Sequence, residues 1–253
     1  MPYVIAVAGK GGTGKTTLAG LMVRALGRDG RGPVLAVDAD PNSCLDVAVG
    51  LRAAKTVSDV LDESHGLRDV PANMPKPVWL EYHLEDCLAE GRGVDLIVMG
   101  RPEGAACYCS ANQMLRTFLD RIIGSYPSVV IDNEAGMEHL SRRTTRDVDL
   151  LLIVSDATVT GARAARRIAD LVRELDLPVK RVAVAVNEAE TMAEPVAGIL
   201  SGDGLELLGF VPHDPGIVEM ELAGRSVAEL PDDSPAVRAV ETMLERQRAE
   251  ATR

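Results

Sequence analysis

Residues 9–17 read Gly9, Lys10, Gly11, Gly12, Thr13, Gly14, Lys15, Thr16 and Thr17. This glycine-rich stretch directly follows an apolar run at residues 3–8 and precedes a segment of helical periodicity at residues 18–26. Glycines let the backbone turn its N–H groups inward, because no side chain obstructs the loop. The following helix presents unpaired N–H groups and the positive end of its dipole to an anion. The stretch therefore predicts a phosphate-binding loop between a strand and a helix.

The spacing from Gly9 to Thr16 matches the pattern G-x-x-x-x-G-K-[ST] in full. Lys15 is predicted to reach the β- and γ-phosphates of a nucleotide, and the Thr16 hydroxyl to be a magnesium ligand. The rest of the loop, from Gly11 to Thr17, is predicted to hold the phosphates. The alternative is a glycine-rich turn with a surface lysine, but it would not explain why every position of the pattern is matched. We therefore expect ATP or ADP with Mg²⁺ at this loop.

Seven apolar runs rich in Val, Ile and Leu alternate with helix-like segments along the chain. The runs lie at residues 3–8, 33–37, 94–99, 128–131, 148–154, 181–186 and 205–211, and the helical segments at 18–26, 111–123, 161–175 and 236–248. Runs that are apolar on consecutive positions predict strands covered on both faces. Their alternation with helices predicts an α/β fold, a doubly wound, mainly parallel sheet with helices on both faces. With 253 residues and 46% apolar content, we expect a single domain, 1–253.

The chain carries 27 basic and 38 acidic side chains, which gives a formal net charge of −11. This charge repels a phosphodiester backbone, and no Lys/Arg cluster is large enough to reverse it, so we expect no nucleic-acid partner. No run approaches the roughly 18 apolar residues of a membrane span, and the first residues resemble no export leader. We therefore expect a cytoplasmic protein without a membrane anchor. Its four cysteines are expected to be thiols, metal ligands or packing residues instead of disulfides.

Acidic residues follow two of the apolar runs. Asp38 and Asp40 end the second run, and residues two apart in a strand project to the same side, where they could meet magnesium or a water beside the phosphates. The alternative is a turn, which Asp, Pro and Asn also favour. Asp132 ends the run at residues 128–131 and is predicted to hold magnesium directly or through water. Gly136 offers a backbone N–H that could sense the γ-phosphate.

Cys107 and Cys109 form a C-x-C motif in a small-residue loop that follows the apolar run at residues 94–99. In an extended chain both thiols project to one side and could bind one ion, and a nearby helix N-terminus would favour thiolates. Two packed thiols are the alternative. A closed thiolate site takes four donors, so a two-fold axis between two copies would complete it. Zinc, an iron–sulfur cluster or nickel would suit such ligands.

Other candidate residues carry weaker signals. Cys87 is predicted to pack in the interior, and no chemical role is expected for Cys44. His65 and His83 have no visible partners along the sequence and are expected to be structural or exposed. A short helix is expected at residues 58–63 and a loop at residues 71–77. Glu138 and His139 are interpreted as polar residues of a moving segment and not as metal ligands.

The string KGGTGKTT resembles the deviant Walker A loop of the MinD/ParA/nitrogenase iron protein class of ATPases. The resemblance implies a homodimer that closes on nucleotide, with Lys10 reaching the nucleotide of the other subunit. It also implies that Asp40 positions the attacking water, that Asp38 stands near the metal, and that Pro212 packs against adenine. Asn187, at the end of another run, could recognise the adenine edge with its amide.

One departure narrows the resemblance. The class usually has a proline inside the D-x-x-x-G motif, but the string here is IDNEAG, with Glu134 in the interior. This string and the C-x-C motif are similar to those of CooC-type ATPases, which mature nickel carbon monoxide dehydrogenase. The resemblance implies an ATP-hydrolysing metallochaperone with nickel or zinc at Cys107 and Cys109, and a nickel enzyme as client. The alternatives are a MinD/ParA-like positioning ATPase and an iron–sulfur redox ATPase resembling the nitrogenase iron protein.

Overall fold

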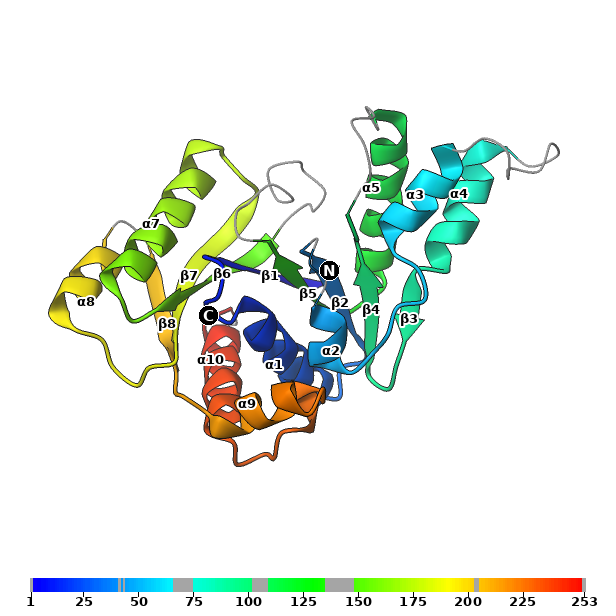
Figure 1. Cartoon of the computed structure of the whole chain (residues 1–253). Helices are drawn as coiled ribbons and strands as arrows, with labels where there is room; N and C mark the ends of the chain where they lie inside the picture. The colour runs from blue at the N-terminus through cyan, green and yellow to red at the C-terminus, as the bar shows by residue number, and fades with distance from the viewer. Residues whose placement is uncertain are drawn as a thin grey trace.

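The computed structural model describes residues 2–40, 42, 44–65, 75–101, 109–134, 148–202 and 205–251. Its centre is an eight-stranded sheet in the order β3-β4-β2-β5-β1-β6-β7-β8, with helices packed on both faces (Figure 1). All neighbouring strands are parallel except β3, which runs antiparallel to β4 at one edge. The predicted fold, a doubly wound and mainly parallel α/β sheet, is therefore confirmed.

Each of the seven predicted strands is present. The bounds are β1 Tyr3–Gly9, β2 Val34–Ala39, β4 Val94–Val98, β5 Ser128–Asn133, β6 Val148–Asp156, β7 Val179–Asn187 and β8 Glu206–Val211. Strand β3, Leu88–Glu90, was not predicted. Three residues are too few to show a period, and this strand forms only because the edge of β4 is available to pair with it.

The four long predicted helices are also present, as α1 Lys15–Gly27, α5 Cys109–Gly124, α7 Val159–Glu174 and α10 Pro235–Ala251. The expected short helix is α3, Val57–His65. Shorter helices were not predicted: α2 Leu45–Val49, α4 Lys76–Glu85, α8 Glu194–Leu200, α9 Pro215–Leu222 and the 3₁₀ turn η1 Val227–Glu229. The expected loop at residues 71–77 is wrong at its end, because Pro77 lies in the first turn of α4, where a missing N–H costs nothing.

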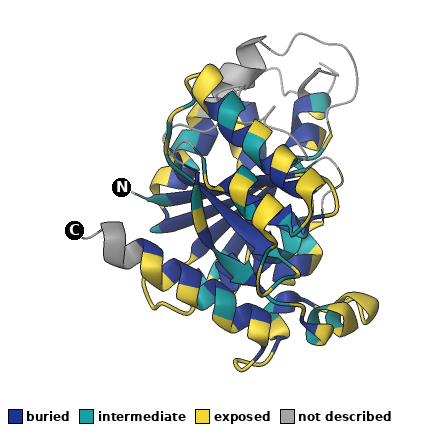
Figure 2. Ribbon diagram, turned by 90° about the vertical axis from the view of Figure 1, so that its left-hand side faces the viewer, coloured by how far each residue is buried: buried dark blue, intermediate teal, exposed yellow. Residues whose placement is uncertain are grey.

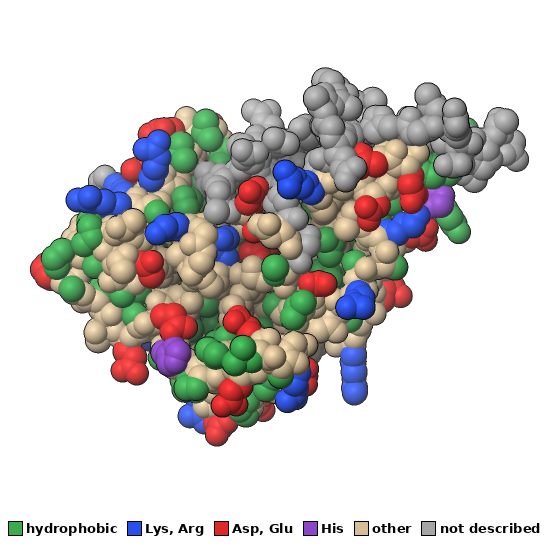
Figure 3. Space-filling model, viewed as in Figure 1, with side chains coloured by type: hydrophobic (Ala, Val, Ile, Leu, Met, Phe, Trp, Pro, Cys, Tyr) green, Lys and Arg blue, Asp and Glu red, His purple; other side chains and the backbone are tan. Residues whose placement is uncertain are grey.

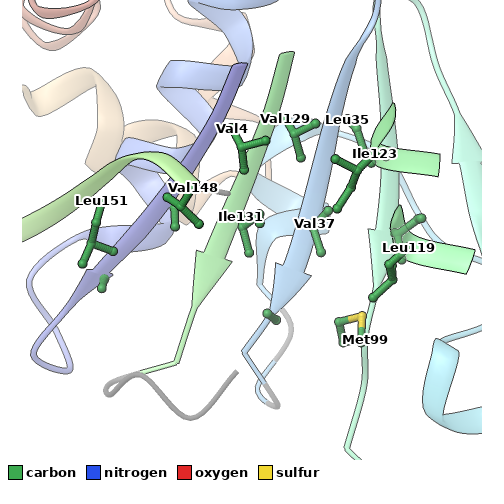
Figure 4. Close-up of a cluster of buried hydrophobic side chains, with 14 of the residues drawn as sticks. Val4, Leu35, Val37, Met99, Leu119, Ile123, Val129, Ile131, Val148 and Leu151 are labelled. Carbon is green, nitrogen blue, oxygen red and sulfur yellow. The ribbon is translucent and has the colours of Figure 1, made fainter. Parts of the chain in front are cut away.

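Alternate residues of the inner strands face two separate apolar layers. In β1, Val4 and Ala6 belong to the layer covered by α3, α4, α5, α7 and α8 (Figure 4). Ile5 and Val7 belong to the layer covered by α1, α2 and α10. Figure 2 shows the resulting interior as a continuous buried band between exposed helix faces. Each fully buried aliphatic side chain contributes roughly 1.5–3 kcal/mol, so this sheet is a rigid support for the loops at its edge.

None of the helices in the described part of the chain is both long enough and apolar enough to span a membrane.

Candidate functional site

The loop at residues 10–14 joins the end of β1 to the start of α1, at the carboxyl edge of the sheet. Gly14 has φ 85°, and a Cβ on it would lie 2.3 Å from Asn187 Nδ2. A Cβ on Gly9 would lie 2.4 Å from the carbonyl oxygen of Val154 in β6. Gly9 is therefore required by the close backbone of β6, and Gly14 by its left-handed backbone and the nearby side chain of Asn187.

Hydrogen bonds within the loop hold its shape. The Thr13 hydroxyl donates to the carbonyl oxygen of Lys10 at 2.9 Å, and Lys15 Nζ lies 3.4 Å from the same oxygen. Lys15 is buried, whereas Lys10, Gly11 and Gly12 are exposed. The ammonium group of Lys15 has three donors, and this one long contact leaves it able to bind phosphate oxygens.

Asp38 and Asp132 lie side by side, because they are register partners at the ends of the adjacent strands β2 and β5. Both carboxyl groups are buried. The Thr16 hydroxyl at the start of α1 donates to Asp132 Oδ2 at 2.5 Å. Asp132 Oδ1 is buried and has no hydrogen-bond partner among the described residues. Three predicted metal-site residues, from three separate elements, therefore meet.

The electrostatics of this pair favour a cation. Burial raises the pKa of Asp132 to about 7, against the hydrogen bond from Thr16, and repulsion by Asp38 adds to the rise. Burial likewise raises the pKa of Asp38 to about 6, although backbone N–H donors act in the opposite direction. Two buried carboxylates with a hydroxyl and an unpartnered oxygen form the hard-oxygen ligand set that Mg²⁺ requires. These residues therefore fit the expected magnesium ion.

Asp38 and Asp40 also make the turn that the alternative interpretation predicted. Asp38 accepts hydrogen bonds from the backbone N–H groups of Asp40 at 3.1 Å and Leu45 at 3.0 Å. Asp40 Oδ1 accepts from both the backbone and the side-chain nitrogen of Asn42 at 2.9 Å. The two aspartates thus order the connection from β2 to α2. The role of Asp40 in positioning water stays a prediction.

Asn187 and Pro212 lie on the other side of the loop. Asn187 ends β7 and pairs in register with Val211 of β8, so Pro212 follows beside it. The Asn187 side chain donates from Nδ2 to the carbonyl oxygen of Thr13 at 3.0 Å, which ties β7 to the phosphate loop. The prediction that Asn187 and Pro212 form the adenine pocket therefore concerns residues adjoining the loop. His213, which follows Pro212, forms an exposed pair with Glu188.

Asn133 is a candidate that the sequence interpretation missed. It directly follows Asp132, is buried, and donates from Nδ2 to the carbonyl oxygen of Val7 at 3.0 Å. Its Oδ1 is buried without a hydrogen-bond partner in the described part of the chain. The Asn133 amide thus links β5 to β1 next to the buried carboxyl group of Asp132. Its position immediately after the Asp of a strand end was the only available signal.

Several predicted site residues are not in the part of the chain that the structure describes. Cys107, Gly136 and His139 fall outside the described residues, and for Cys109, the first residue of α5, only the backbone is described. Within residues 2–40, 42, 44–65, 75–101, 109–134, 148–202 and 205–251, no group of three His, Cys, Asp or Glu side chains could hold a metal ion. The ligand role of the two motif cysteines therefore stays a prediction.

The remaining cysteines and a histidine have clear surroundings. Cys87 is buried, as predicted, and burial raises its pKa to about 12, which makes it a packing residue and not a reactive thiol. Cys44 is exposed at the start of α2. His83 contacts Asp86 and the ring of Trp79, so it has partners that sequence spacing did not reveal. On the described surface in Figure 3, acidic and basic side chains are interspersed.

The chain is similar to known proteins over nearly its whole length. Residues 4–227 match the CobQ/CobB/MinD/ParA nucleotide binding domain. An uncharacterized ATP-binding protein of Methanocaldococcus jannaschii is 40% identical over 247 residues, covering 96% of this chain and 97% of that protein. The carbon monoxide dehydrogenase accessory protein CooC of Rhodospirillum rubrum is 33% identical over 249 residues, covering 92% and 91%. The structure of the septum site-determining protein MinD with Mg-ADP from Pyrococcus horikoshii has a TM-score of 0.69 and 22% identity, covering 99% and 98%.

These similarities agree with the geometry of the loop. The matched region contains β1, the phosphate loop, α1 and both strands that carry Asp38 and Asp132. The likeness to MinD is one of fold, since fewer than a quarter of the residues are identical. The predicted ATP hydrolase activity is confirmed at the level of the family. The chain therefore belongs to the CobQ/CobB/MinD/ParA family of nucleotide-binding proteins, and it is an ATPase.

Proposed function

We propose that this ATPase is a nickel metallochaperone that assists maturation of carbon monoxide dehydrogenase or a related nickel enzyme. The observation that carries the proposal is its similarity, over nearly the whole chain, to a carbon monoxide dehydrogenase accessory protein. The C-x-C motif at Cys107 and Cys109 adds two soft ligands, in a chain whose described residues include no other cluster of this kind. We propose that all 253 residues act as one domain, since the sheet order interleaves strands from both halves of the chain.

Hydrolysis rests on positioning and on neutralisation of charge. Lys15 and the N–H groups of the loop would hold the phosphates, while Thr16, Asp132 and Asp38 would hold Mg²⁺. When bound, Mg²⁺ neutralises charge that develops on the phosphate oxygens. Asp40 would orient the attacking water. The close contact of Asn187 with the Thr13 carbonyl supports a fixed loop that need not reorganise when nucleotide binds.

Dimerisation would couple the nucleotide to the metal. Lys10 is exposed at the tip of the loop, as a residue must be if it is to reach the nucleotide of a second copy. Its ammonium group would add positive charge at the phosphates only in the dimer. Two copies related by a two-fold axis would bring four motif thiols together and complete a site that one copy leaves half built. ATP binding and hydrolysis would then assemble and release this nickel or zinc site.

The test is metal analysis of anaerobically purified protein, offered Ni²⁺ or Zn²⁺ with and without Mg-ATP. We expect about one ion per two chains with nucleotide, lost in Cys107→Ala/Cys109→Ala. Cys44→Ala, which removes an exposed cysteine near the acidic turn, is the matched control and should keep the metal. Equal metal content in the double variant, or full ATP-dependent binding by an enforced monomer, would rule out the proposed site.

A further inference from the structure

A cavity of about 190 Å³ lies against the second half of α1, away from the phosphate loop. The last two turns of α1 form one wall, and Gly93 and Val94 at the start of β4 form another. The cavity is therefore toward the amino edge of the sheet, and Arg24 lies about 13 Å along α1 from Lys15. Three of its ten lining residues are Arg24, Arg28 and Arg92, and none is acidic.

Arg24 is fixed in the wall of this cavity. Its side chain is only 2% exposed. Nε donates to the carbonyl oxygen of Ala228 at 3.2 Å, and Nη2 donates to the carbonyl oxygen of Leu230 at 2.9 Å and to Asp232 at 2.7 Å. Nη1 is buried and has no hydrogen-bond acceptor among the described residues. A carboxylate oxygen of Glu241 is 4.0 Å from Nη1, which is an ion pair without a hydrogen bond.

The other two guanidinium groups are also incompletely neutralised. Arg28 shares the single carboxylate of Asp232 with Arg24, and that carboxylate is 76% exposed. Arg92 is exposed, and no hydrogen-bond or ion-pair partner is present for it in the described part of the chain. Burial, followed by repulsion from Arg28, lowers the pKa of Arg24. The cavity thus has an excess of positive charge in a chain whose net charge is −11.

A purely structural role explains only part of this arrangement. Cations in the last turn of a helix interact favourably with its dipole, which accounts for Arg24 and Arg28. The carbonyl oxygens of Arg24 and Leu26 accept from the N–H groups of Arg28 and Asp29, so these oxygens are paired within the helix end. Arg92 belongs to a different element, the turn before β4, and a helix dipole gives no reason for its position.

We propose that this cavity binds a dianionic phosphate group, either free phosphate or the phosphate of a small phosphomonoester. Guanidinium groups bind such oxyanions through paired, charge-assisted hydrogen bonds. Arg28 and Arg92 would supply the charge-assisted hydrogen bonds, and the buried guanidinium group of Arg24 would add positive charge from the wall of the cavity. The site is independent of the phosphate loop and of the nickel proposal, because no residue is shared with either.

Isothermal titration of the full chain tests the proposal, with Mg²⁺ and a non-hydrolysable ATP analogue present to fill the nucleotide site. Inorganic phosphate should bind saturably, and Arg92→Gln should weaken binding by about tenfold. Arg92 is exposed and has no hydrogen-bond or ion-pair partner in the described part of the chain, so this variant should keep the fold. Arg238→Gln removes an exposed arginine of α10 that does not line this cavity, so it should leave phosphate binding unchanged.

Further titrations distinguish the source of the phosphate group. Tighter binding of glycerol phosphate than of inorganic phosphate assigns the cavity to a phosphomonoester, and the reverse order assigns it to free phosphate. Acetate should bind more weakly than both, because it carries one charge. The proposal is overturned if inorganic phosphate shows no saturable binding, if Arg92→Gln binds it as the wild type does, or if acetate binds equally well.

Discussion

Two buried aspartates near the ends of strands in the same sheet differ in how their charge is satisfied. Asp214, shortly after β8, accepts hydrogen bonds from the N–H groups of Gly216 at 2.9 Å and Ala236 at 3.3 Å, and from the Ser234 hydroxyl. Burial alone would raise its pKa, but these donors outweigh burial and the pKa is lowered. Among the described residues, Asp132 accepts a hydrogen bond only from the Thr16 hydroxyl and its Oδ1 has no partner, and burial raises its pKa.

The difference separates a structural charge from a functional one. Asp214 joins the start of α9 to the start of α10, and its partners are supplied by the chain itself. Asp132 is buried beside a second carboxylate, an arrangement that the folded chain alone leaves unfavourable. Incomplete satisfaction of a buried charge in a cleft is typical of a site that awaits a ligand. Substitutions of Asp214 should therefore affect mainly stability, whereas substitutions at the Asp132 site should affect nucleotide binding and hydrolysis.

The largest effect should follow from Lys15→Ala. Lys15 is the buried cation of the phosphate loop, so its loss removes charge stabilisation from the phosphates while few contacts within the fold are lost. We expect the rate of ATP hydrolysis to fall about 10²–10³-fold, to background. The free energy of unfolding without nucleotide should change by less than about 1 kcal/mol. Phosphate release measured under saturating Mg-ATP, together with urea denaturation, gives both quantities.

Lys55→Ala is the control for this change. Lys55 is a surface lysine that pairs with Glu63 at 2.9 Å, and an exposed pair of this kind contributes about 0–1 kcal/mol. Both hydrolysis and stability should stay close to the wild-type values. Near-normal turnover in Lys15→Ala would refute the assigned nucleotide site.

Features that depend on local pattern were predictable from the sequence. The loop at residues 9–17 needs only its own glycines, Lys15 and Thr16, and Asp132 follows an apolar run directly. The central strands carry runs of consecutive apolar residues because both faces are covered, so their signal is strong. The pairing of Asp38 with Asp132 followed from the rule that parallel strands present their carboxyl ends at one edge.

Features that depend on distant contacts were not predictable. The donors of Asp214 include Ser234 and Ala236, some twenty residues away, and no pattern in the sequence predicts these hydrogen bonds. Strand β3 forms because the β4 edge is available, and α4 begins among prolines that looked like a loop. Asn133 is noticeable only once β5 and β1 are known to be neighbours, since its partner is the Val7 carbonyl. Tertiary context decided each of these.

A smaller effect, confined to stability, should follow from Asp214→Ala. The change removes three hydrogen bonds to a charged acceptor, and the Ser234 hydroxyl that it leaves is buried. We expect a loss of about 2–4 kcal/mol in the free energy of unfolding at pH 7, measured by urea denaturation. The rate of hydrolysis per folded molecule should be unchanged, because Asp214 does not contact the phosphate loop.

Asp170→Ala is the matched control for that prediction. Asp170 is a partly exposed helix residue that pairs with Arg166 at 3.2 Å and Arg173 at 2.5 Å. Its loss should cost less than about 1 kcal/mol. If Asp214→Ala were no more damaging than Asp170→Ala, the three buried hydrogen bonds would not be what stabilises the junction of α9 and α10.

The smallest and most diagnostic effect is expected for Asp132→Asn without nucleotide. Burial raises the folded-state pKa of Asp132 to about 7, above the ordinary value of 3.8, so the folded protein binds this proton more tightly than the unfolded chain. The resulting penalty is fully present above about pH 7, shrinks as pH falls, and vanishes below about pH 4, where both states are protonated. The neutral amide should therefore stabilise the nucleotide-free protein by about 1–2 kcal/mol at pH 8.

The same variant should lose stability relative to the wild type once Mg-ATP is added, because the wild-type carboxylate then has a cation to neutralise it. Thermal unfolding at pH 8 and pH 5, with and without Mg-ATP, measures both the stabilisation expected without nucleotide and the relative loss of stability expected with it. Asp214→Asn should behave in the opposite way without ligand and destabilise the protein at pH 8, since its native carboxylate is already fully paired. Equal destabilisation by both asparagine variants would mean that Asp132, like Asp214, is satisfied by the folded chain and needs no ligand.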